Sequence, residues 1–144
     1  RARVRGGVKV TVSTTCPAPP EVVWEWIADP HKHIRMLPDE IRNARVLENG
    51  DMACELVSVG VHEPMTVRIV EQDPPRRLVE ERVDGRRKGT TVFEIEPEGD
   101  HASRVTLTAD VQLSMLAAAV ASGPIKSALG DQLRNLATLV ATEA

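Results

Sequence analysis

Hydrophobic and polar residues alternate in several short segments of the chain. In residues 8–12, valine occupies every second position, separated by Lys9 and Thr11. In residues 103–112, Val, Leu, Ala and Val point one way, while Thr, Thr, Asp and Gln point the other. A period of two places alternate side chains on opposite faces of a strand. Both segments are therefore predicted to be strands with one covered face and one solvated face.

Turn signals divide the middle of the chain into further strands. Asn49-Gly50 tolerates positive φ and predicts a hairpin between its flanking segments. Proline-rich and glycine-containing clusters follow near residues 73–75, 84–85 and 97–100. The strands predicted after the first one cover residues 41–48, 52–61, 65–72, 77–83, 89–96 and 103–112.

Two short helices are predicted directly after the first strand. Pro20 suits the first turn of a helix, because its missing N–H is not needed there. This helix is expected over residues 20–28 and ends before Pro30, since a residue preceding proline avoids the helical region. A second helix is expected over residues 31–37, ending at Pro38.

A long helix is predicted over residues 114–142. Its second half carries an apolar stripe with a period of 3.6, whereas residues 116–121 are apolar on all sides. That segment should contact the core, a ligand, a partner subunit or a membrane. Gly123-Pro124 is expected to kink or break the helix. The stripe consists of Ile125, Leu129, Leu133, Leu136 and Val140.

The segment Val8–Pro38, with Ala18-Pro19-Pro20-Glu21-Val22-Val23-Trp24 and then Ala28-Asp29-Pro30, resembles the polyketide cyclase/dehydrase-like members of the START/Bet v 1 (SRPBCC) superfamily. The stretch Val70–Val79 and the ending Leu133-Arg134-Asn135-Leu136 are similar to that family as well. The resemblance implies an α+β helix-grip fold: a seven-stranded curved antiparallel sheet around the C-terminal helix. In relatives, the cavity between sheet and helix holds hydrophobic ligands; some cyclise or dehydrate polyketides and others carry lipids.

Composition and charge narrow the class of protein. With 144 residues and 42% hydrophobic content, one domain over residues 1–144 with its own core is expected. A net charge of -3 gives no reason to expect nucleic acid as a partner. The longest uncharged run, residues 111–125, is shorter than the ~20 residues of a spanning helix, so stable membrane insertion is not expected. The two cysteines are interpreted as reduced thiols of a cytoplasmic protein, and no cofactor is expected.

Apolar side chains from the second helix, two strands and the last helix are the candidate lining of a ligand cavity. Methionine suits such a lining because its side chain is flexible and polarizable. Ordinary core packing is the alternative interpretation for each residue. The candidates are Met36, Leu37, Met65, Val67, Phe93, Met115, Leu116, Val120, Ile125 and Leu129.

An acid is the first candidate for chemistry. Glu81 shares a strand face with Val79 and Val83, so an inward-facing valine side would place Glu81 at the cavity wall with a raised pKa, as a general base. The alternative is a solvated rim position, or pairing with Arg68 or Arg82. A shift of one residue in register exchanges the two faces.

Histidines near the cavity mouth are the second candidate. His31 and His33 lie on the helix that closes the mouth in relatives, and His33 could transfer protons near neutral pH. A surface role is the alternative. A metal site is not predicted, because His62, His101 and the cysteines lack ligand spacing.

Three functions remain open at this point. The first is binding or transport of a small hydrophobic molecule, such as a lipid or a polyketide-like compound. The second is a cyclase/dehydrase-like enzyme that uses Glu81, His33 or Arg68 for proton transfer. The third is an interaction module in which residues 115–121 form a homodimer or partner surface.

Overall fold

The computed structural model describes residues 7–58, 60–84, 88–113 and 115–143 of the chain. Seven strands form one antiparallel sheet in the order β1-β7-β6-β5-β4-β3-β2. The strands are β1 (Gly7–Cys16), β2 (Ile41–Val46), β3 (Met52–Ser58), β4 (Val61–Asp73), β5 (Arg77–Arg82), β6 (Gly89–Pro97) and β7 (Ser103–Gln112). The helices are α1 (Pro20–Ala28), α2 (Pro30–His33), the 3₁₀ turn η1 (Ile34–Met36) and α3 (Met115–Glu143).

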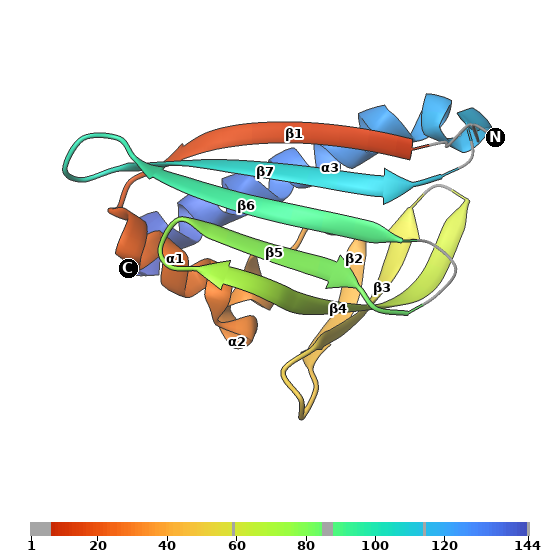
Figure 1. The fold of residues 1–144 in the computed structure, drawn as a ribbon, viewed down its shortest axis with the longest axis horizontal. Coiled ribbons are helices and arrows are strands. Elements are labelled where there is room, and N and C mark those ends of the chain that lie inside the picture. Colours follow the sequence, from red (N-terminus) through yellow and green to blue (C-terminus); the bar gives the residue numbers. More distant parts are fainter. Residues whose placement is uncertain (1–6, 59, 85–87, 114, 144) are drawn as a thin grey trace.

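The first strand, β1, lies beside the last strand, β7 (Figure 1). The two edges of the sheet are formed by β1 and β2. In this pairing Val10 lies opposite Ala109, and Val12 lies opposite Leu107. The apolar positions of the two strands therefore share one face. This is the concave face of the sheet, which the predicted alternation requires to be covered.

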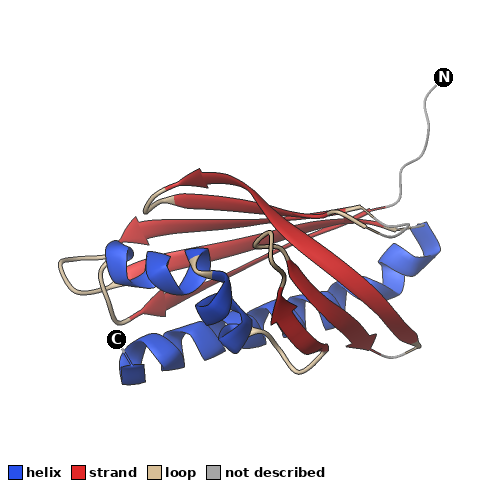
Figure 2. Ribbon diagram, turned by 90° about the horizontal axis from the view of Figure 1, so that it is seen from below, coloured by secondary structure: helices blue, strands red, loops and turns tan. Residues whose placement is uncertain are grey.

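Helix α3 runs along that face, while α1 and α2 lie at one end of the sheet (Figure 2). Within the sheet, α3 packs mainly against β1. Helix α1 and the turn η1 also contact α3. The helix-grip arrangement predicted from the sequence is thereby confirmed. Helix α3 continues through Gly123 and Pro124, so the break considered from the sequence does not occur.

The hydrophobic core lies between the sheet, the second half of α3 and the two short helices. Burying a side chain of Leu or Val size contributes ~1.5–3 kcal/mol, so this cluster is the main source of stability. The core is built by Val23, Trp26, Ile27, Met36, Leu78, Phe93, Ile95, Val105, Leu107, Leu133, Leu136 and Val140.

The strand pairing is irregular in two places. The β4–β5 register shifts between Ile69 and Glu71, which marks a β-bulge. The β2–β3 register shifts between Arg42 and Arg45, and Asn43 there has a φ of 55°. Both shifts change the direction in which neighbouring side chains point, and the first one lies beside the candidate site described next.

Candidate functional site

Strand β5 turns its even-numbered residues toward the concave face. Leu78 pairs with Phe93 across to β6, and both side chains are fully buried. Glu80, two residues further on, lies on the same face of the strand as Leu78 and is 8% exposed. Glu81 is exposed and lies opposite Arg68 in the β4–β5 register, on the outer face. The valine face of β5 thus points outward, and the acid at the interior wall is Glu80 rather than Glu81.

His33 lies beside Glu80. It is the last residue of α2, which begins where the Asp29 side chain accepts a hydrogen bond from the backbone N–H of His31. The His33 ring is completely buried and meets Phe93 edge-on, with ring centroids 5.5 Å apart. The structure thus brings His33 into the interior, whereas the sequence interpretation placed it at the cavity mouth.

The two nitrogens of His33 have different environments. Nδ1 lies 2.8 Å from the backbone oxygen of Ile27. Because a carbonyl oxygen only accepts, Nδ1 carries the proton and donates it to this bond. In the neutral ring, Nε2 is then an acceptor that points away from Ile27.

That acceptor faces the carboxyl group of Glu80. His33 Nε2 and Glu80 Oε2 are 3.7 Å apart, which is longer than a hydrogen bond. Both atoms are buried, and neither has a hydrogen-bond partner among the described residues. Burial raises the pKa of Glu80 above its ordinary value, while the proximity of His33 acts in the opposite direction. The interior thus contains an incompletely satisfied acid–base pair.

The pair is accessible from one side only. The side chain of Glu80 keeps 10% exposure, whereas that of His33 has none. The remaining exposure of the pair therefore belongs to Glu80, and His33 lies behind it as a proton partner. Such an arrangement suits hydrogen bonding to a ligand, and also proton transfer.

The cation nearest along the strand is already paired. Arg82 is two residues from Glu80 and its side chain is 9% exposed. Its Nη2 donates to Glu63 Oε1 at 3.1 Å and to the backbone oxygen of Pro64 at 3.2 Å. A second carboxylate, Asp84, lies 3.9 Å from Nε. The charge of Arg82 is therefore balanced by carboxylates other than Glu80.

A thiol is also close to the acid. Burial raises the pKa of Cys54 to about 11, and the charge of Glu80 acts in the same direction. The thiol therefore stays protonated near neutral pH, which makes it a poor nucleophile.

Arg68 is separated from the pair. Its Nη2 donates to Asp51 Oδ2 at 2.9 Å, and this bond lowers the pKa of Asp51. The two residues line a pocket of about 490 Å³ between the α1–α2 junction, the β2–β3 turn and β4. Ile69, the cross-strand neighbour of Glu80, lines the same pocket. Ile69 is thus the link between the pocket and the acid–base pair, and neither Glu80 nor His33 lines the pocket.

The candidate cavity residues fall into different environments. Met36 and Phe93 are fully buried in the core. Half-buried positions are Leu37, Met65, Val67, Ile125 and Leu129. Val120 is 74% exposed and does not line the interior. The side chains of Met115 and Leu116 lie outside the described part of the structure.

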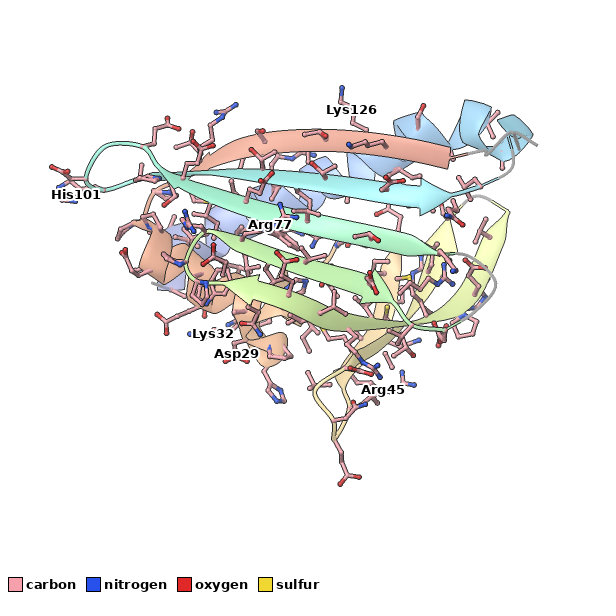
Figure 3. The ribbon with its side chains drawn as sticks, in the orientation of Figure 1. Asp29, Lys32, Arg45, Arg77, His101 and Lys126 are labelled. Carbon is pink, nitrogen blue, oxygen red and sulfur yellow. The ribbon has the colours of Figure 1, made fainter. Side chains whose placement is uncertain are left out.

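The other histidines do not join the pair. His31 is exposed, and His62 lies 2.8 Å from Glu55 on a solvated surface. His101 occupies the turn between β6 and β7 and points away from the sheet (Figure 3). Within residues 7–58, 60–84, 88–113 and 115–143, no three metal-ligating side chains form a cluster.

The sequence pattern of a known family, described as "Polyketide cyclase / dehydrase and lipid transport", matches residues 7–141. The chain belongs to this family. The family description concerns hydrophobic ligands and agrees with the resemblance seen in the sequence. No curated protein matches the chain significantly.

Solved structures share the fold of this chain. The crystal structure of TTHA0849 from Thermus thermophilus has a TM-score of 0.81 at 20% identity, covering 95% of this chain and all 100% of the other. Norcoclaurine synthase from Thalictrum flavum, a point mutant bound to a transition-state analogue, has a TM-score of 0.77 at 10% identity, covering 97% and 98%. At such identities the likeness establishes the fold alone. Among the described helices, none combines the length and apolar character needed to cross a membrane.

Proposed function

We propose that the protein binds a small, mainly apolar ligand between the concave face of the sheet and α3, with Glu80 contacting the ligand's polar group. The observation that carries this proposal is the buried Glu80–His33 pair, whose facing atoms lack hydrogen-bond partners among the described residues. Buried polar groups in proteins are nearly always satisfied, and an unsatisfied one costs free energy. A ligand that bonds to Glu80 would offset this cost.

The exposure of apolar residues supports the same location. Met65 and Val67 share the concave face of β4 with Ile69, yet both remain half-buried. Protein atoms therefore do not fill the space in front of them completely. Each ligand group of Leu or Val size buried there would contribute ~1.5–3 kcal/mol to binding.

The test uses N-phenyl-1-naphthylamine, an uncharged fluorophore that brightens in apolar sites. Saturable binding of one molecule per chain is expected. Val67→Trp, which fills the interior, should weaken binding at least tenfold. Val70→Trp is the matched control, because Val70 lies on the same strand and is 46% exposed.

The proposal fails if the fluorophore shows no saturable binding, or if both tryptophan variants bind it like the wild type. Circular dichroism establishes that each variant is folded. Should Val67→Trp not fold, Met65→Phe replaces it as a smaller addition to the same wall. Native mass spectrometry of the freshly purified protein provides an independent measurement, in which a co-purified apolar compound is expected.

A cyclase/dehydrase-like activity is the second candidate, and the raised pKa of Glu80 favours it. A raised pKa makes the carboxylate a stronger base, and His33 lies behind it as the exchange partner. If this holds, Glu80→Gln abolishes turnover of a polyketide-like substrate but retains fluorophore binding. A pure carrier binds such compounds and releases them chemically unchanged.

A further inference from the structure

The charged groups around Glu80 determine which polar groups the interior accepts. His33 on α2 faces Glu80 directly, and Cys54 on β3 lies near enough for its pKa to respond to the acid. From its own strand, Arg82 approaches Glu80 but is bound to Glu63 on β4. In the described part of the chain, His33 is thus the one ionisable group within ion-pair distance of Glu80.

The hydrogen atoms of the pair can be counted. The Nδ1 proton of His33 is engaged by the Ile27 carbonyl. A buried pair without net charge avoids an uncompensated desolvation cost, and such a pair holds one proton between Nε2 and the Glu80 carboxyl. Glu80 then presents either an O–H donor or a carboxylate acceptor to the space it borders.

Ligand groups differ in how well they match this pair. A hydroxyl can donate and accept, so it matches both arrangements, and a ketone accepts from the O–H form. A carboxylate only accepts, and it would bring a net negative charge into an interior whose pair is neutral. In the arrangement with the proton on His33, Glu80 would also present negatively charged oxygens to it. Desolvating a charge without a partner is costly. The Arg82 guanidinium already faces two carboxylates, Glu63 at 3.1 Å and Asp84 at 3.9 Å, so its charge is balanced, although its buried Nε has no hydrogen-bond partner among the described residues.

We infer that the Glu80–His33 pair selects apolar ligands that carry an uncharged oxygen, a hydroxyl or a ketone, and rejects otherwise similar ligands that end in a carboxylate. The inference rests on the proposed function and specifies its ligand class.

The experiment measures displacement of N-phenyl-1-naphthylamine at pH 8 by 1-decanol, 2-decanone and decanoate. In the wild type, decanol and decanone should displace the fluorophore at concentrations at least tenfold below that of decanoate. Because decanoate is also less hydrophobic, the decisive quantity is how the decanoate-to-decanol ratio changes on mutation. In Glu80→Gln this ratio should fall at least fivefold, since the amide has no charge to repel the ligand. Glu81→Gln is the matched control and should keep the wild-type ratio, because Glu81 is exposed on the outer face.

An unchanged ratio in Glu80→Gln would overturn the inference, and so would tighter binding of decanoate than of decanol by the wild type. Failure of the fluorophore to bind the wild type would instead overturn the proposed function, and the inference with it. Glu80→Met, which is similar in length and uncharged, replaces the glutamine variant if that variant does not fold. The same fall in ratio is expected for it.

Discussion

The buried carboxyl of Glu80 should make stability depend on pH in a particular direction. Because burial raises its pKa above the ordinary value of 4.5, the folded protein keeps the proton at pH values where the unfolded chain has lost it. The folded state then binds more protons than the unfolded state, so the free energy of unfolding falls as pH rises above the ordinary Glu value. In Glu80→Gln this contribution is absent.

The size of the effect follows from the number of protons involved. One proton retained on folding changes the free energy of unfolding by up to about 1.4 kcal/mol for each pH unit. The advantage of Glu80→Gln over the wild type should therefore grow by up to this amount per unit, beginning between pH 4 and 5. With a urea dependence of ~1–3 kcal/mol per M, the difference in unfolding midpoint grows by up to roughly 0.5–1.4 M per pH unit.

Urea titrations of the wild type, Glu80→Gln and Glu81→Gln from pH 4 to pH 8 provide the measurement. Taking differences between proteins cancels the titration of the groups that they share. Glu81→Gln should run parallel to the wild type, because that side chain is exposed. The reasoning is refuted if Glu80→Gln also runs parallel. It is equally refuted if the wild type becomes more stable relative to Glu80→Gln as the pH rises, because the fold would then stabilise Glu80 as a carboxylate.

Two further predictions concern other buried groups. Burial raises the pKa of Cys16 and Cys54 to about 11, so only ~1 thiol in 1000 is ionised at pH 8. Iodoacetamide should therefore label both cysteines in urea but not in the native protein, and mass spectrometry measures the labelling. Ser103 Oγ donates to the Ala18 carbonyl at 2.7 Å in the core. In urea titrations, Ser103→Ala should lower the free energy of unfolding by ~1–3 kcal/mol. The matched change Ser122→Ala, at an exposed position, should alter it by no more than ~0.5 kcal/mol. Equal effects of the two substitutions would contradict this prediction.

Parts of the fold follow directly from local sequence. Strand β7 has the predicted limits, residues 103–112, because one face is covered by the core and the other is wet. Helix α1 also has its predicted limits, residues 20–28, since Pro20 and Pro30 set its two ends. In both cases the signal lies in the residues themselves and needs no knowledge of distant contacts.

Strand β4 shows what local sequence leaves out. The prediction began it at residue 65, but it begins at Val61 and runs through Pro64. Proline cannot donate to a ladder and so argues against a strand interior. Pro64 is tolerated because β5 pairs with β4 only from Val67 onward, which leaves one side of β4 open at Pro64. Whether a proline is tolerated at this position therefore depends on the length of the neighbouring strand β5.

The structure moves the candidate acid from Glu81 to Glu80. Both faces of residues 77–83 carry apolar and charged side chains, so alternation alone does not decide which one is buried. The decision comes from Leu78, which packs against Phe93 and draws Glu80 inward with it. The burial of His33 likewise depends on tertiary contacts, with Phe93 of β6 and Glu80 of β5, for which the local sequence carries no signal.

The irregular edge strand β2 has a consequence for the behaviour of the protein at high concentration. An exposed sheet edge is a template on which a strand of another molecule can add, and this is a route to aggregation. In β2 the left-handed conformation of Asn43 and the shift between Arg42 and Arg45 interrupt the row of backbone groups. The Asn43 amide also donates to Glu55 at 3.0 Å, which holds the irregularity in place. A second copy of the chain would find no continuous ladder there to extend.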